Sequence, residues 1–266
     1  FRYRIPADGE YLLRITDHLK RGGADFVYRV EFTTTQPSIA LGIPRVSRYG
    51  QERQTIYVPR GNRIATRMTI QRRSFSGDVV LSGEGLPQGM TMKALPVPAN
   101  MSTWPVLFEA AADAPIGGKL LDFTCKPAEP KEGQDVTGHF RNFADYVRYR
   151  NAQILWGRPV DKLAFAVIEE APYSLEIVQP KVPIVQNGSM NLKILVHRKE
   201  GFDGAIRVEF PFRPPGVGTR SYLNIAKGKN EANYALNANS NAAAGKWPVF
   251  ALGLAETPKG TVMVSS

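Results

Sequence analysis

Residues that could act as nucleophiles or general bases are few and widely separated in this chain. Ser189 lies in the turn-like run Asn187-Gly188-Ser189-Met190. A catalytic serine needs a histidine base and an aspartate that orients the base. The three histidines are scattered along the chain: His18, His139 and His197. We therefore interpret Ser189 as part of a tight turn that leads into a strand, and we predict that the chain has no catalytic residue.

The cysteine, histidine and acidic residues are not spaced as metal sites or catalytic thiols require. No paired cysteines, His-Glu-x-x-His motif or calcium-binding EF-hand loop occurs. Cys125, the only cysteine, follows a strand-like run and reads as a half-buried structural thiol. Asp17 and Asp25 flank a predicted loop. They could bind a weak calcium ion or be two solvated acids, and the sequence leaves both interpretations open. We predict no metal and no cofactor.

Glu169 and Glu170 form the only adjacent acidic pair in the sequence. In a strand their side chains would point to opposite faces. That geometry does not suit a pair of glycosidase carboxylates acting across one bond.

Aromatic side chains could form a sugar-binding surface. Trp156 lies outside the internal repeat, so it has a better chance of exposure than Trp104 or Trp247. Tyr146, Tyr149 and Trp156 could form a stripe, although packing in a core or between domains is our preferred interpretation.

Basic residues are concentrated at the two ends of the chain, whose net charge is +10. Residues 1–73 hold 14 basic and 6 acidic residues, a balance of +8, and residues 171–266 hold 11 and 6, a balance of +5. Such a surface favours polyanions. Four arginines in one region are a possible site for an anionic polymer: Arg60, Arg63, Arg67 and Arg73. Little aromatic interleaving accompanies them, so nucleic acid is not expected as a partner.

An internal repeat is the most informative feature of the sequence. Arg72 is followed by Phe75-Ser76-Gly77, and Arg198 is followed by Phe202-Asp203-Gly204, at offsets of 126 and 127 residues. Both copies alternate short apolar runs with Gly/Pro turns roughly every 8–12 residues, which is typical of β-sandwiches. We predict that the copies share one fold, with Gly77 and Gly204 in equivalent turns.

The predicted fold is all-β with negligible helix: tandem immunoglobulin-like antiparallel β-sandwiches, preceded by a β-hairpin from a jelly-roll-like domain. The hairpin strands are expected at residues 11–15 and 26–32, where β-forming residues alternate with polar ones. Two strands alone are not a stable domain, so these must join a larger sheet or dock on the rest of the chain. The expected boundaries are the end of a β domain at 1–36, the first sandwich at 37–127, a linking β segment or inserted hairpin at 128–170, and the second sandwich at 171–266.

Three segments carry a resemblance to known families. The runs at 11–17 and 25–30 look like the end of a bacterial pre-peptidase C-terminal domain. The repeated Arg, Phe-x-Gly, Pro-x-Gly and Ala-x-x-Gly pattern resembles immunoglobulin-like modules of large exported bacterial proteins. The run 171–177, followed by 180–183, is similar to planctomycete-type surface proteins that combine both modules. Such proteins are often labelled subtilisin-like proteases by association.

This resemblance implies a non-enzymatic module of a larger exported protein, extracytoplasmic in location. We expect its partners to be other domains of the same protein, a cell-surface protein or an anionic polysaccharide. An accessory region of a secreted hydrolase, such as a subtilase-like protease, is the alternative. No run of 18 apolar residues occurs, so no membrane span is expected.

Overall fold

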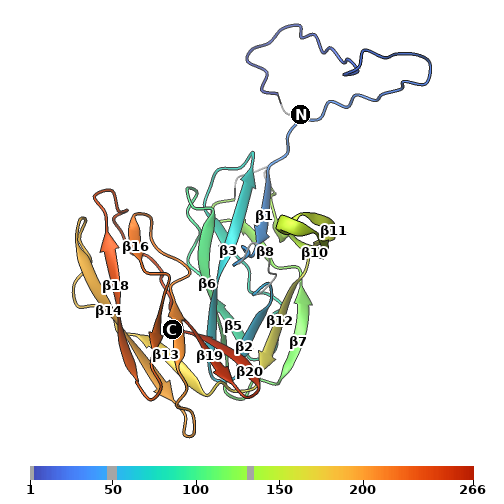
Figure 1. The fold of residues 1–266 in the computed structure, drawn as a ribbon. Coiled ribbons are helices and arrows are strands. Elements are labelled where there is room, and N and C mark those ends of the chain that lie inside the picture. The colour runs from blue at the N-terminus through green and yellow to red at the C-terminus, as the bar shows by residue number, and fades with distance from the viewer. Residues whose placement is uncertain (1–2, 47–52, 131–134) are drawn as a thin grey trace. The chain divides into compact units, whose positions relative to one another are not determined.

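The computed structural model describes residues 3–46, 53–130 and 135–266, and in these ranges the regular structure is β-strand apart from one 3-10 turn, η1 (Arg150–Ala152). The chain divides into two compact units, Phe1–Thr35 and Gln36–Ser266. The strands of the second unit build two β-sandwiches (Figure 1). The predicted all-β class is therefore confirmed.

The hairpin predicted at residues 11–15 and 26–32 is not observed, because no strand forms between residues 3 and 35. Leu12 is 95% exposed and Val27 is 88% exposed. A two-stranded ribbon is marginal in water unless further strands or a core cover its apolar side chains. The alternating pattern in this segment is therefore not enough to form a strand pair by itself.

The first sandwich contains a seven-stranded sheet with the order β4-β8-β9-β1-β3-β6-β5 and a three-stranded sheet with the order β2-β12-β7. Its strands are β1 (Ser38–Gly42), β2 (Ile56–Pro59), β3 (Arg63–Arg73), β4 (Val79–Leu81), β5 (Met90–Lys93), β6 (Thr103–Ala110), β7 (Gly117–Leu121), β8 (Thr124–Pro127), β9 (Gly138–Phe140) and β12 (Leu163–Ile168). Strand β1 pairs antiparallel with β3 and parallel with β9.

The segment predicted as a linker or inserted hairpin at 128–170 has a mixed role. Strands β10 (Asn142–Arg148) and β11 (Ile154–Val160) do form a separate two-stranded hairpin. Strands β9 and β12 instead belong to the sheets of the first sandwich, and Phe140 and Phe165 are buried in its core. The first sandwich therefore extends to Ile168, because β9 and β12 complete its two sheets and contribute to its core.

The second sandwich packs two four-stranded sheets with the orders β13-β14-β18-β16 and β17-β15-β19-β20. Its strands are β13 (Tyr173–Ile177), β14 (Ser189–Arg198), β15 (Ile206–Glu209), β16 (Val217–Thr219), β17 (Tyr222–Ile225), β18 (Glu231–Ala238), β19 (Leu252–Thr257) and β20 (Gly260–Ser265). These orders give the ABED and CFG sheets of an immunoglobulin-like sandwich, with β17 added beside the C strand. Tyr173 and Tyr234 are fully buried between the sheets.

The repeated Arg and Phe-x-Gly residues occupy equivalent places in the two sandwiches, as predicted. Arg72, the last residue but one of β3, donates from Nε to the carbonyl oxygen of Gly77 at 3.1 Å. Arg198 ends β14 and donates from Nη1 to the carbonyl oxygen of Gly204 at 2.6 Å. In each turn a Cβ added to the glycine would lie 3.0 Å from the ring of the preceding phenylalanine. The repeat in the sequence is therefore a repeat of the same structural corner.

The two sandwiches share a hydrophobic core. Trp104 on β6 lies with its ring centroid 5.8 Å from that of Phe212 and 6.0 Å from that of Trp247, both in the second sandwich. Phe250 and Leu252 of the second sandwich also belong to the core cluster of the first. Polar contacts cross at other points, including the amide of Ala65, which donates to Ser265 Oγ at 2.8 Å.

Candidate functional site

The β10–β11 hairpin is the part of the second unit whose large apolar side chains are most consistently exposed. The strands pair antiparallel from Asn142↔Val160 to Arg148↔Ile154, with register shifts around Val147. Seven large apolar residues on these strands and their turn are at least 43% exposed: Phe143, Tyr146, Val147, Tyr149, Ile154, Leu155 and Trp156. An isolated two-stranded ribbon with such exposure needs an anchor to the rest of the fold.

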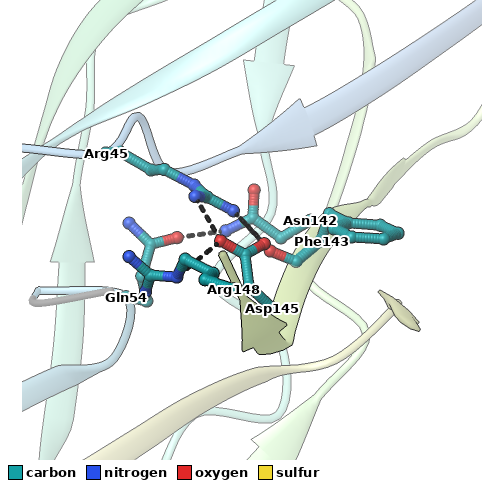
Figure 2. A network of polar contacts seen from close by, with 6 residues as sticks. All are labelled: Arg45, Gln54, Asn142, Phe143, Asp145 and Arg148. Carbon is teal, nitrogen blue, oxygen red and sulfur yellow. Dashed lines mark hydrogen bonds and ion pairs between the residues drawn. The ribbon is translucent and has the colours of Figure 1, made fainter. Parts of the chain in front are cut away.

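Asp145 supplies that anchor (Figure 2). Arg45, which follows β1, donates from Nη1 and Nη2 to the two carboxylate oxygens of Asp145 at 2.6 and 2.5 Å. Arg148 lies 3.2 Å from the same carboxylate through Nε. The Asp145 side chain is fully buried, whereas those of Arg45 and Arg148 remain 30% and 24% exposed. Paired, bidentate guanidinium contacts of this kind fix geometry as well as adding energy.

Two neighbouring contacts extend the anchor. Arg45 also donates to the backbone carbonyl of Phe143 at 3.3 Å, and Asn142 Nδ2 donates to Gln54 Oε1 at 2.5 Å. The hydrogen bonds from Arg45 lower the pKa of Asp145 below its ordinary value, against the opposing effect of desolvation. The carboxylate therefore stays ionised at neutral pH and holds the inner face of the hairpin to the first sandwich.

The outer face of the hairpin carries an aromatic pair. Asp145 lies opposite Gly157, so Trp156 and Arg158, on either side of Gly157, point to the other face of the ribbon. The rings of Tyr146 and Trp156 lie 5.0 Å apart, and these residues are 59% and 53% exposed. Arg158 lies with its Cζ 5.9 Å from the Trp156 ring centroid. We call Tyr146, Trp156 and Arg158 the hairpin patch.

The preferred interpretation of the stripe Tyr146, Tyr149 and Trp156, packing in a core or between domains, is wrong. All three residues are more than half exposed. The sequence contained one usable signal, which is that Trp156 lies outside both repeat copies. The sequence could not show that Asp145 holds its own face of the hairpin against the first sandwich and leaves Trp156 on the other face. The reason is that Asp145 binds Arg45, which lies 100 residues away in the sequence.

The four arginines predicted as a polymer site do not form one exposed array. Arg60 lies 3.8 Å from Glu169, and Arg63 lies 3.9 Å from Glu109. Arg67 is half-buried and lines a cavity between the sandwiches with Arg53, Tyr57, Pro211, Phe250 and Met263. Desolvation by burial is the main cause that lowers the pKa of Arg67, and the nearby Arg213 and Arg53 lower it further.

Arg73, at the far end of β3, is exposed. Ala65, which alternates with Arg63 and Arg67 along β3, is buried, and its amide donates to Ser265 on β20. The sequence could not show this because the covering strand is about 200 residues away.

The other residues considered for chemistry have ordinary structural partners. Ser189 Oγ donates to Asn237 Oδ1 at 2.7 Å on the neighbouring strand. His139 pairs with Asp122 at 2.6 Å and His197 with Glu176 at 2.9 Å. Lys199 pairs with Glu170.

The loop acid Asp17 and the thiol of Cys125 also have ordinary surroundings. Asp17 accepts hydrogen bonds from Arg21, which lower the pKa of Asp17, and from the amide of Leu19 at 3.0 Å. Over residues 3–46, 53–130 and 135–266, no group of three or more His, Cys, Asp or Glu side chains is arranged to hold a metal ion. Cys125 is fully buried rather than half-buried, and burial raises the pKa of its thiol to about 12. At neutral pH this thiol is therefore protonated.

Comparisons with known proteins give structural matches only. No protein-family model and no curated protein matches the chain. Among solved structures it is similar to the D00-D0 domain of intimin, with 11% identity over 85% of this chain and 98% of that chain and a TM-score of 0.23. It is also similar to a protein of unknown function from Porphyromonas gingivalis W83, with 11% identity over 87% and 99% and a TM-score of 0.26.

The titin domains z1z2 in complex with telethonin match with 11% identity over 88% of this chain and 95% of that chain, at a TM-score of 0.21. At these TM-scores the matches add nothing to the fold assignment, which rests on the strand orders given above. In the part of the chain that the structure describes, no helix is long and apolar enough to cross a membrane.

Proposed function

We propose that this chain is a non-catalytic structural module of a larger exported bacterial protein, in which two β-sandwiches act as one stiff spacer. The observation that carries the proposal is the shared core, in which Trp104 is 3% exposed and contacts Phe212 and Trp247. A linker without such packing would leave the two sandwiches free to move relative to each other.

Polar contacts between the sandwiches support the same proposal. Asn62 Nδ2 donates to the carbonyl oxygen of Tyr173 at 2.9 Å, where the second sandwich begins. Arg53 lies 3.0 Å from Glu209, with both side chains less than a quarter exposed. These contacts lie at different points of the boundary, so together they oppose both bending and twisting between the sandwiches.

An extracytoplasmic location, and partners among other domains of the same protein or at a cell surface, belong to this proposal through the sequence resemblance. The alternative, an accessory region of a secreted hydrolase such as a subtilase-like protease, has the same architecture. Measurement of stiffness alone does not separate the two. Peptide-hydrolysis assays on the full-length protein and on this region would separate them, because an accessory region acts only beside a catalytic domain.

The stiffness is tested with spin labels at Glu84 and Glu200, one exposed residue in each sandwich, in a chain with Cys125→Ala. We expect a narrow distance distribution between the labels, and a broader one in Trp104→Ala, because truncating a buried tryptophan removes about 3–5 kcal/mol of packing. Trp156→Ala is the matched control, since Trp156 is exposed and outside this core. A broad distribution in the unsubstituted chain, with both sandwiches folded, would contradict the spacer proposal.

A further inference from the structure

We propose that the hairpin patch binds an acidic polysaccharide, with Tyr146 and Trp156 contacting a sugar ring and Arg158 contacting its carboxylate or sulfate group. This inference is independent of the spacer proposal, because none of these residues lies in the core that joins the sandwiches.

The aromatic rings provide the contact for the sugar. Tyr146 and Trp156 lie 5.0 Å apart with an interplanar angle of 38° and are each more than half exposed. The apolar face of a pyranose presents C–H groups, which make weak favourable contacts with the face of an aromatic ring. Single exposed apolar residues are common on protein surfaces, but a contiguous exposed group on an anchored element marks an interaction site.

The charge of the hairpin selects an anionic ligand. Between residues 142 and 160 there are three arginines, Arg148, Arg150 and Arg158, and one acid, Asp145. Asp145 is buried against Arg45 and Arg148, so it does not neutralise the outer face. Among the residues that the structure describes, Arg158 forms no ion pair, and its planar guanidinium can bind a carboxylate or sulfate in a bidentate manner.

A second pair of an aromatic ring and an arginine lies at the turn of the same hairpin. Arg150 lies with its Cζ 6.0 Å from the ring centroid of Tyr149, which is 58% exposed. The repetition of ring and cation along one hairpin suits a polymer whose units repeat both a sugar ring and a negative charge.

The size of the patch favours a glycan over a protein partner. A stable protein interface uses roughly 20–30 residues on each side and about 800 Å² per partner. The hairpin strands contain seven residues each, and only part of them faces outward. A small group of rings and guanidiniums matches a short stretch of sugar units instead. Single-stranded nucleic acid would use a basic groove that follows its backbone, whereas the patch lies on one face of a two-stranded ribbon.

The rest of the molecule offers a matched comparison. Tyr222 is 45% exposed, and Arg207 lies with its Cζ 4.0 Å from the Tyr222 ring centroid. Arg207 also pairs with Glu209 at 3.0 Å, so its guanidinium, unlike that of Arg158, already has a carboxylate partner. We therefore expect this second ring and guanidinium pair not to bind an acidic glycan.

The test is affinity electrophoresis of the whole chain in gels that contain polygalacturonate, dextran sulfate or neutral dextran at low salt. We expect retardation by an acidic polymer and none by neutral dextran. Trp156→Ala should weaken binding by about two- to tenfold, the effect of losing one aromatic contact with a sugar ring. Arg158→Gln should weaken binding to the acidic polymers, and Trp156→Phe should restore most of the affinity. Circular dichroism of each variant checks that the fold is retained.

The two acidic polymers distinguish carboxylate from sulfate as the recognised group, and binding of either supports the proposal. Tyr222→Ala should bind like the unsubstituted chain. Equal retardation of Trp156→Ala and the unsubstituted chain would overturn the proposal, as would binding of neither acidic polymer. Tighter binding of single-stranded DNA than of both polysaccharides, lost in Trp156→Ala, would also overturn it and assign the patch to nucleic acid.

Discussion

Asp145 shows how one buried carboxylate can determine which face of an element is available to solvent. Its two oxygens accept hydrogen bonds from Arg45, and Arg148 lies beside them. Gly157, directly opposite, has no side chain, and a Cβ there would collide with the ring of Phe143 and lie 2.5 Å from the carbonyl oxygen of Ala144. The ring of Phe143 occupies the space beside Gly157, the Asp145 side chain is buried against Arg45, and Trp156 lies on the opposite face.

The first prediction concerns the pH dependence of this anchor. A carboxyl whose pKa is lowered in the folded state stabilises that state above its ordinary pKa, 3.8 for Asp145, and the contribution is lost as the pH falls through the folded value. We expect the backbone amide hydrogens of β10 and β11 to exchange with solvent at pH 3 faster than the pH dependence of the intrinsic exchange rate predicts. The amide hydrogens of β14 should follow the intrinsic dependence.

Asp145→Asn should show the same opening already at pH 7, with hairpin amides exchanging at least about fivefold faster, because a neutral amide binds two guanidiniums more weakly. Asp161→Asn, an exposed acid just after β11, is the control and should exchange normally. Normal hairpin exchange in Asp145→Asn would show that Arg45 does not hold the hairpin.

At the scale of elements, the same corner is built twice. Arg72 reaches from the end of β3 to the loop before β6 and donates to the carbonyl oxygen of Met101 at 2.6 Å. Arg198 reaches from the end of β14 to the loop before β18 and donates to the carbonyl oxygen of Lys229 at 2.9 Å. Each guanidinium also binds its Phe-x-Gly turn, so one side chain joins a strand end, a turn and a loop.

The second prediction is that Arg72 and Arg198 contribute similar amounts to the free energy of unfolding. Arg72→Ala should lower the free energy of unfolding by about 2 kcal/mol, since several backbone carbonyls lose a charged donor. Arg198→Ala should have an effect of similar size. Urea denaturation followed by circular dichroism measures both, and Arg73→Ala, an adjacent exposed arginine, should change the free energy by less than about 0.5 kcal/mol. A cost at Arg72 no larger than at Arg73 would contradict the proposed role of the corner.

At the scale of the whole molecule, the packing of one sandwich on the other redistributes the basic surface. The net charge of +10 is a property of the composition, but burial decides which cations meet solvent. Arg67 is half-buried beside the second sandwich, and Arg60 and Arg63 have acidic neighbours. Of the four predicted positions, Arg73 alone is exposed, and the other three are partly buried.

The third prediction concerns where an anionic polymer meets this surface. Replacing Arg63 and Arg73 together by Gln should reduce retention on a heparin-like column at low salt only slightly, because the only effect expected is the lower net positive charge. Arg150→Gln with Arg158→Gln removes the same charge from the hairpin and should reduce retention more. Retention falls with salt in either case, because bound counterions are released. A larger loss of retention in the Arg63 and Arg73 double variant than in the Arg150 and Arg158 double variant would indicate that the polymer binds the arginines of β3 instead of the hairpin.

The sequence by itself determined the fold class and the repeat of the sandwich. Strand alternation and turn residues are local properties, and the spacing of Arg72 and Gly77 recurs at Arg198 and Gly204 because the same corner is closed by residues near one another in sequence. For residues 128–170 the local pattern indicated β structure but left a linking segment and an inserted hairpin both open, and it did not show that β9 and β12 belong to the first sandwich.

Tertiary structure decided which of these surfaces is available for binding. The contacts between Arg45 and Asp145, between Ala65 and Ser265, and between Trp104 and Trp247 join residues 100 or more positions apart. Such contacts depend on how whole sheets pack, and a period of two along a strand shows two faces without showing which one another element will cover. Residues 11–32 carry a strand pattern without forming strands in the described structure, because a period of two does not by itself supply the neighbouring strands that a stable sheet needs.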